Sequence, residues 1–518
     1  MPLPRRHFLK TSLATAAIVA TPNLVLAQGG DAIAETSNGR VRGRSENGLK
    51  VFRGIPYGGD TGGRNRFMPP TPAAKWSGVR DCTDWGHIAP KPVSSIVPNT
   101  YGAMVHWSDY RGGLSEDCLN LNIWTPGTDS AKRAVVMIIH GGGFTSGSGN
   151  LTALEGDHMA RAGDVVVVTV NHRLGALGYA DLSAIGGAAF AASGVAGQMD
   201  LVQALQWVRD NITRFGGDPG RVMITGQSGG GGKVSTLLAM PSAKGLFHRA
   251  VLQIGSTITL TRREAAQRNA EAMLAKLGLT KNDMGKLQAL PFEQIVNAQG
   301  NVGPVVDGVV VPRDPFAPDA PAVSAAVPMM IGSCLEDSGL NMTDWDIDEK
   351  GLAAWTETQA PGKGAAVLAD YRRLYPAKKP FFIKAMIATD KGLRRNTVLQ
   401  AERKAAQGAA PAYMYRWDWQ TPAQGGKFGA IHGTDLSMSF SNPDTDVGTN
   451  TPSARAMARR IGDATIAFAK TGNPDCAAIP HWPAYDAATR AQMIFDDRTR
   501  VENDPNRELR LLWNQLLA

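Results

Sequence analysis

A serine between glycines follows a run of residues that is typical of a buried strand. Residues 222–225 (VMIT) precede residues 226–230 (GQSGG), and a helix-compatible run starts at Lys233. In a G-x-S-x-G turn between a strand and a helix, the serine backbone is strained, and the glycines let the neighbouring chain pass closely. The pattern predicts that Ser228 is a nucleophile held at the edge of a sheet.

Two other interpretations of this turn compete with the first. A phosphate-binding loop requires G-x-x-x-x-G-K-[ST]. Here Gln227 stands where the first glycine belongs, and Val234 follows Lys233, so the pattern fails at two positions. The chain contains 58 glycines, so a G-x-S-x-G pattern can also arise by chance. The motif alone therefore does not exclude a glycine-rich turn without a function. Partner residues elsewhere in the chain must therefore decide.

A second glycine-rich segment offers such partners. The strand-like residues 134–139 (AVVMII) end in residues 140–144 (HGGGF). Acyl transfer needs N–H donors where the carbonyl oxygen becomes negative, and successive glycines turn their amides inward without a blocking side chain. We assign oxyanion-hole donors to Gly142 and Gly143, with Gly229 as the third. The alternative is a flexible loop after a strand, which the presence of Ser228 makes less favourable.

A serine nucleophile also needs an imidazole base and a carboxylate that orients the imidazole. After a nucleophile in this type of turn, the chain order is serine, acid, histidine. Glu336 and Asp337 in residues 332–338 (GSCLEDS) follow the strand-like residues 328–331, and His432 in residues 429–433 (GAIHG) follows the strand-like residues 412–417, so these residues fit that order. Chain order alone leaves both carboxylates open.

The elements that must position these residues alternate between strand and helix. Residues 200–211 have helical periodicity, with Leu201, Leu205 and Val208 on one face. Short continuous apolar runs that alternate with helices predict an α/β fold, with a mostly parallel central sheet covered by helices on both faces. The strand-like runs are residues 134–139, 165–170, 222–225, 250–254, 328–331 and 412–417.

Further segments, distributed over the whole chain after the first 27 residues, resemble the type-B carboxylesterase family, in the order that this family has them. The family includes bacterial carboxylesterases, cholinesterases and bile-salt lipases. The matching segments are residues 52–57 (FRGIPY), 116–119 (EDCL), 121–126 (LNIWTP), 171–175 (NHRLG), 211–219 (NITRFGGDP), 304–308 (PVVDG) and 468–474 (FAKTGNP).

This resemblance implies a fold, a reaction and a triad. It implies the α/β-hydrolase fold, with helical insertions at residues 263–277 and 350–375 that form a lid. It implies hydrolysis of a small-molecule carboxylic ester through an acyl-enzyme, without a metal or another cofactor. His432 matches the G-x-x-H-G segment of the family, and the resemblance selects Asp337 as the acid. Glu336 stays the competitor; if Asp337 is the acid, we expect Glu336 to be a flanking surface group.

Some positions depart from the pattern of the family. Gln227 and Gly229 stand where Glu and Ala are usual, and Asn120, Leu201 and Ile254 also differ. None of these changes removes a catalytic group. They leave open the shape of the substrate pocket, and an amidase or a lactonase remains an alternative because acyl-enzyme chemistry is shared. A non-enzymatic adhesion protein, a second alternative, is disfavoured because serine, acid and histidine are all present.

The N-terminus has the features of an export signal. Residues 4–10 (PRRHFLK) contain an arginine pair, and a mildly apolar run leads to residues 25–27 (VLA), a small-x-small cleavage site. We expect residues 1–27 to be a twin-arginine signal peptide, with Pro4 where Ser or Thr is more usual, that the twin-arginine export machinery reads. Residues 28–518 then form one periplasmic or secreted domain. The alternative is a basic amphipathic N-terminus.

Net charge, hydropathy and cysteine spacing bear on whether the chain binds nucleic acid, a membrane or a metal ion. The formal charge of +8 falls to +5 without the three basic residues of the signal, and no Lys/Arg run extends beyond pairs, so nucleic-acid binding is not favoured. No apolar stretch of about 20 residues follows the signal, so no membrane span is predicted. Cys82, Cys118, Cys334 and Cys476 are too widely spaced for a metal knuckle or a redox pair. Cys82 with Cys118 is the one disulfide that local sequence suggests.

Overall fold

The computed structural model of the chain describes residues 31–93, 101–104 and 111–517. The expected signal peptide, residues 1–27, lies outside the described residues. Within the described residues, no helix is both long enough and apolar enough to cross a membrane.

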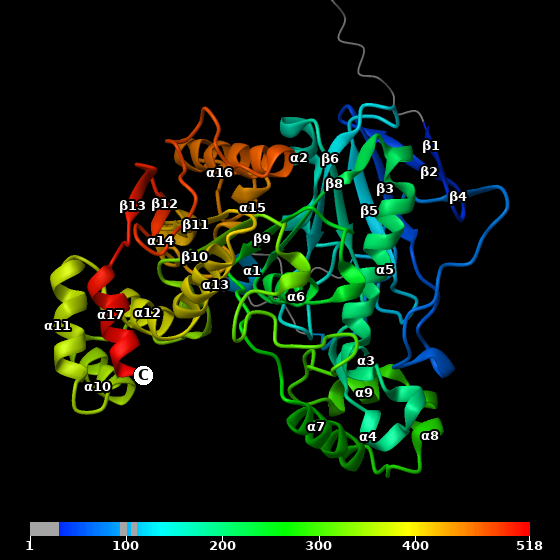
Figure 1. Cartoon of the computed structure of the whole chain (residues 1–518), viewed down its shortest axis with the longest axis horizontal. Helices are drawn as coiled ribbons and strands as arrows, with labels where there is room; N and C mark the ends of the chain where they lie inside the picture. Colours follow the sequence, from blue (N-terminus) through cyan, green and yellow to red (C-terminus); the bar gives the residue numbers. More distant parts are fainter. Residues whose placement is uncertain (1–30, 94–100, 105–110, 518) are drawn as a thin grey trace, which may run out of the picture.

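One large mixed sheet runs through the molecule (Figure 1). Its strand order is β1-β2-β3-β5-β7-β6-β8-β9-β10-β11-β12-β13, and β4 pairs with β2. The strands from β7 to β12 in this order are parallel, whereas the pairs from β1 to β7 and the pair β12–β13 are antiparallel; β4 is parallel to β2. The strands are β1 (Asp31–Thr36), β2 (Gly39–Glu46), β3 (Leu49–Pro56), β4 (Val79–Asp81), β5 (Asn120–Thr125), β6 (Arg133–Ile139), β7 (Val166–Val170), β8 (Gly217–Gln227), β9 (Arg249–Gln253), β10 (Met329–Cys334), β11 (Ala412–Trp417), β12 (Ala491–Phe495) and β13 (Arg500–Asn503).

Helices cover both faces of this sheet. The α-helices are α1 (Tyr101–Met104), α2 (Asp157–Gly163), α3 (Gly175–Tyr179), α4 (Ser183–Gly186), α5 (Ala196–Asn211), α6 (Gly229–Leu238), α7 (Arg263–Lys276), α8 (Met284–Ala289), α9 (Phe292–Ala298), α10 (Glu349–Gln359), α11 (Gly364–Leu374), α12 (Pro380–Lys391), α13 (Leu393–Gln407), α14 (Ala423–Gly426), α15 (Leu436–Ser439), α16 (Pro452–Thr471) and α17 (Arg507–Leu516).

Strand β6 shows how the core is divided. Side chains alternate between the two faces of a strand. Val136 and Ile138 belong to a buried cluster with residues of α2 and α16, whereas Val135 and Met137 belong to a second cluster with residues of α5, α6 and α13. Because both faces are buried, the strand is a continuous apolar run, which is why its sequence predicts it well.

Two groups of helices lie outside these layers. Helices α3, α7 and α9 contribute to a third buried cluster at the lower end of the molecule in Figure 1, where α4 and α8 also lie. Helices α10, α11, α12 and α17 lie together at the left side of the same view. The helical segment expected at residues 350–375 is two helices, because Pro361 and Gly362, with a φ of +74° at the glycine, separate α10 from α11.

Candidate active site

The predicted site segments leave the sheet at the carboxyl ends of neighbouring parallel strands. Strand β6 ends directly before His140, β8 directly before Ser228, and β10 three residues before Asp337. His432 follows β11, which pairs with β10. The carboxyl ends of parallel strands form one edge of an α/β sheet, which is where such folds bind their ligands.

Ser228 occupies a strained turn between β8 and α6. Its backbone has φ 58° and ψ −126°, a conformation that costs a non-glycine residue of the order of 1–3 kcal/mol. Its N–H donates to the carbonyl of Gln253, 2.9 Å away. A Cβ at Gly226 would lie 2.3 Å from the backbone of Gly230, and one at Gly230 would lie 2.2 Å from the carbonyl of Ile139. The glycines of the motif are therefore required by close backbone approach, as the sequence predicts.

The segment after β6 lies next to this turn. Gly142 and Gly143 both have positive φ, +87° and +61°. The carbonyl of Gly142 is directed back into its own loop, where it accepts hydrogen bonds from the N–H and the Oγ of Ser146, at 3.0 and 2.9 Å. Within the described part of the chain, the N–H groups of Gly142 and Gly143 have no hydrogen-bond acceptor. They are available to a negatively charged oxygen.

Gly229 directly contacts this loop. A Cβ built on Gly229 would lie 2.2 Å from the carbonyl oxygen of Gly143. Gly229 is also the first residue of α6, and the first N–H groups of a helix have no partner within the helix. The three glycines assigned as oxyanion-hole donors are therefore brought together.

Asp337 and His432 form the other half of the site. His432 Nδ1 lies 2.6 Å from Asp337 Oδ1, and the Asp337 side chain is fully buried. An ionised carboxylate only accepts hydrogen bonds, so this contact assigns the proton to Nδ1 and leaves Nε2 as the free base. Among the hydrogen bonds of the described residues there is none between His432 and Ser228 Oγ. Hydrogen bonds of this kind are often long in the absence of substrate.

Glu336 has a different position from the one expected. It is fully buried, so the expectation of a flanking surface group is wrong. Its N–H donates to the carbonyl of Ala430 (3.2 Å), and its Oε2 accepts from the N–H of Ala430 (2.7 Å). Oε1 forms an ion pair with Lys378. Glu336 therefore fastens the segment two residues before His432 to the segment that carries Asp337.

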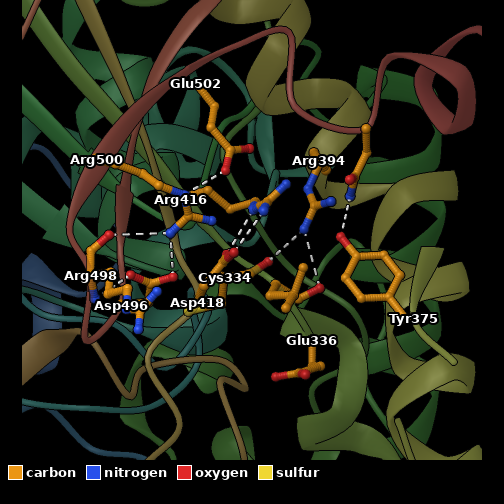
Figure 2. Close-up of polar contacts among 12 residues, drawn as sticks. Cys334, Glu336, Tyr375, Arg394, Arg416, Asp418, Asp496, Arg498, Arg500 and Glu502 are labelled. Carbon is orange, nitrogen blue, oxygen red and sulfur yellow. Dashed lines mark hydrogen bonds and ion pairs between the residues drawn. The ribbon is translucent and has the colours of Figure 1, made fainter. Parts of the chain in front are cut away.

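An arginine supports the acid segment from the other side. Arg394 on α13 donates to the carbonyl oxygens of Cys334 (3.2 Å) and Leu335 (3.1 Å). Figure 2 shows Arg394 directed at these carbonyl groups, while the carboxylate of Glu336 points away from it. Arg394 is itself paired with Asp390 at 2.6 Å. No sequence motif indicated Arg394, because its partners are 59 and 60 positions away in the chain.

A further carboxylate lies close to the Asp337–His432 pair. Asp435 is buried, and its Oδ2 accepts a hydrogen bond of 2.8 Å from Tyr415. Burial raises the pKa of Asp435 to about 6, and the charge of Asp337 contributes to this shift.

Among the described residues, no group of three or more His, Cys, Asp or Glu side chains is arranged to hold a metal ion.

The cysteines are thiols. Cys82 and Cys118 are both buried and free, so the suggested disulfide between them is absent. Burial raises the pKa of both thiols, which keeps them protonated at neutral pH. Cys334, at the end of β10, is buried as expected, and burial raises its pKa well above the usual value.

Sequence comparison relates the chain to known hydrolases. The profile of the carboxylesterase family matches residues 30–510. The chain is 35% identical to the para-nitrobenzyl esterase of Bacillus subtilis (strain 168), over 92% of this chain and 97% of that protein. It is 30% identical to the phenmedipham hydrolase of Pseudarthrobacter oxydans, over 90% of this chain and 95% of that protein.

Solved structures agree with the sequence comparison. A carboxylesterase of Geobacillus stearothermophilus matches with a TM-score of 0.81 and 34% identity, over 93% of this chain and 99% of that chain. An esterase of Clostridium hathewayi, described as able to hydrolyse aliphatic aromatic polyesters, also matches with a TM-score of 0.81, at 33% identity. It covers 94% of this chain and 100% of its own.

Proposed function

The chain belongs to the carboxylesterase family and is a carboxylic ester hydrolase, and we propose that it cleaves its ester through Ser228, His432 and Asp337 by way of an acyl-enzyme. The observation that carries this proposal is the 2.6 Å hydrogen bond between Asp337 and His432, two residues 95 positions apart. The strained Ser228 lies at the end of a parallel strand of the same sheet. Side chains of this type in this order perform acyl transfer in α/β-hydrolases.

The reaction follows from these positions in two steps. In the first, His432 Nε2 takes the proton of Ser228 Oγ, which attacks the ester carbonyl, and the carbonyl oxygen becomes negative beside the N–H groups of Gly142, Gly143 and Gly229. The bond to the alcohol then breaks, and the alcohol leaves with the proton from His432. In the second step, water repeats the sequence on the acyl-enzyme and releases the acid. Asp337 holds the imidazole and stabilises its charged form.

The nucleophile is tested by covalent labelling. An organophosphate should inactivate the enzyme stoichiometrically and add its mass to the peptide that contains Ser228. A fully inhibited enzyme with an unlabelled Ser228 would contradict the assignment.

We propose small-molecule esters as substrates. The similar protein of Bacillus subtilis is named for such an ester, a para-nitrobenzyl ester. A panel of p-nitrophenyl acetate, butyrate and octanoate, compared with a p-nitroanilide and a lactone, tests this class. We expect kcat/KM to be highest for an ester. A higher value for the anilide or the lactone would assign the site to an amidase or a lactonase.

We also propose that the chain reaches the periplasm or the exterior by twin-arginine export, on the basis of residues 4–10 and 25–27. That route recognises the arginine pair. Changing Arg5→Lys together with Arg6→Lys should leave the precursor in the cytoplasm, as cell fractionation would show. Wild-type amounts of mature protein in the periplasm would mean that another route exports it.

A further inference from the structure

A buried lysine lies five residues after the nucleophile. Lys233 on α6 is fully buried, and its Nζ donates a hydrogen bond of 3.0 Å to the carbonyl of His140, the first residue of the oxyanion loop (residues 140–147). Among the described residues, Lys233 forms no ion pair with an Asp or Glu. A buried ammonium without a counter-ion is costly, so a residue of this kind requires a reason.

The groups around Lys233 are neutral. The rings of His140 and His172 are 4.7 Å apart, and burial, followed by the charge of Lys233, lowers the pKa of both well below the usual value. The ring of Phe144 faces the ammonium group at 5.6 Å. Burial lowers the pKa of Lys233 itself to about 7. The ammonium group is therefore held mainly by the carbonyl of His140 and by an aromatic face.

A second buried lysine contacts the other end of the oxyanion loop. Lys91 is 4% exposed, and its Nζ donates a hydrogen bond of 3.2 Å to the carbonyl of Gly147. Each lysine therefore fixes the direction of one terminal peptide group of the loop. Between these peptides lie Gly142 and Gly143, which have positive φ angles and, as glycines, no side chain that could hold them in place.

We propose that Lys233, together with Lys91, positions the oxyanion loop so that the N–H groups of Gly142 and Gly143 face the oxygen that becomes negative in the transition state. The inference rests on the proposed function. Lys233 acts through the backbone of the loop and is a positioning residue. A displacement of about 1 Å at such donors can lower the rate by about 100-fold.

The test removes the ammonium group and keeps an apolar, unbranched side chain about as long as the alkyl stem of lysine. Lys233→Met removes the hydrogen bond to His140. The matched control is Lys404→Met, because Lys404 on α13 is also buried and donates to a backbone carbonyl, that of Ala325, at 2.6 Å. Any general cost of removing a buried lysine affects both variants, whereas loss of loop positioning affects only the first.

The measurements are kcat and KM for p-nitrophenyl butyrate and the inhibition constant of a trifluoromethyl ketone. Ser228 Oγ adds to the ketone carbonyl, its proton passes to His432, and the adduct carries an oxyanion. For Lys233→Met we expect kcat to fall about 10- to 100-fold and the inhibition constant to rise by a similar factor, with KM changed by less than about threefold. For Lys404→Met we expect all three values to stay within about threefold.

The outcomes separate this inference from the proposed function. If the wild-type enzyme does not bind the ketone, or if Ser228→Ala binds it equally well, the proposed function fails. If the wild type binds it and Lys233→Met keeps both kcat and ketone affinity, the positioning role is wrong. If Lys233→Met does not fold, Lys91→Met decides: unchanged kcat and ketone affinity there would overturn the proposal.

Discussion

The two halves of the site are held in place by different kinds of interaction. On the acid side, Asp337 and His432 are tied to their surroundings by side chains: Glu336 joins the two segments, and Arg394 holds the carbonyls before Asp337. On the side of the proposed nucleophile, the groups are a strained serine and backbone amides. The segments touch there by glycine against backbone, and side chains (Lys233 and Lys91) contact only the two ends of the oxyanion loop.

This difference follows from what each half must do. A proton relay needs an imidazole in one tautomer, and a carboxylate with neighbouring ion pairs can impose that orientation. An oxyanion hole needs bare N–H groups close to the substrate, so side chains cannot line it and the loop must be held from outside. Removal of the Asp337 charge should therefore damage the first half. Addition of a methyl group inside the loop, or loss of a lysine that holds the loop from outside, should damage the second.

The largest effect is expected from the nucleophile itself. Ser228→Ala should lower kcat by about six orders of magnitude, as loss of the serine does in other triads, because the remaining residues do not form an acyl-enzyme. Single-turnover and steady-state assays measure the loss, and circular dichroism should show an unchanged fold. A residual activity above about 1% of wild type would mean that another group attacks the ester.

The next largest effect is expected at the acid. Asp337→Asn keeps the shape of the side chain but presents an amide where the imidazolium needs a negative charge, and kcat should fall about four orders of magnitude. The same p-nitrophenyl assay at several pH values measures it. Near-normal activity in this variant would remove Asp337 from the triad, and with it the argument from its hydrogen bond to His432.

The sequence predicts much of this site because chemistry and strand position restrict the residue types. The runs of β6, β8 and β10 are buried on both faces, so they are continuous and apolar, and the functional residues follow where they end. The antiparallel strands were not predicted. In β1, for example, three short side chains point inward and alternate with exposed residues, which is a weak pattern.

The supporting residues could not be predicted for a different reason. The partner of Lys233, the carbonyl of His140, lies 93 positions earlier in the chain, and the partner of Glu336, the backbone of Ala430, lies 94 positions later. Nearly every residue has a backbone N–H and a carbonyl group, so the residue type does not show which of them accepts or donates a hydrogen bond. For Glu336 the neighbouring residue Asp337 also has the chemistry of an acid, so only the fold separates their roles.

A smaller effect is expected from one methyl group on the nucleophile side. In Gly229→Ala the new Cβ would meet the carbonyl of Gly143 at 2.2 Å, so the oxyanion loop must move. We expect kcat to fall about 10- to 100-fold, with KM nearly unchanged. Gly285→Ala on α8, where a Cβ has no neighbour within 4 Å, is the matched control and should keep full activity.

The outcome of this substitution bears on the departure from the family pattern at Gly229, where alanine is usual. A loss of activity would mean that the loop of this chain lies closer to the nucleophile turn than an alanine permits. Unchanged activity in Gly229→Ala would show that the loop can shift without disturbing its donors, and would weaken the contrast between the two halves.

The smallest effect on turnover is expected from Glu336→Gln. The amide keeps an oxygen for the N–H of Ala430, so His432 should stay in place and kcat should fall by less than about tenfold.

In Glu336→Gln the ion pair with Lys378 is lost, which should lower the free energy of unfolding by about 2 kcal/mol. Lys378→Met should destabilise the protein more, by about 3–5 kcal/mol, because it leaves a buried carboxylate without a counter-ion. In the double variant the two effects should therefore not add, and denaturant unfolding of the four proteins measures the coupling. A loss of turnover in Glu336→Gln as large as in Asp337→Asn, with unchanged stability, would instead give Glu336 a share in orienting the imidazole.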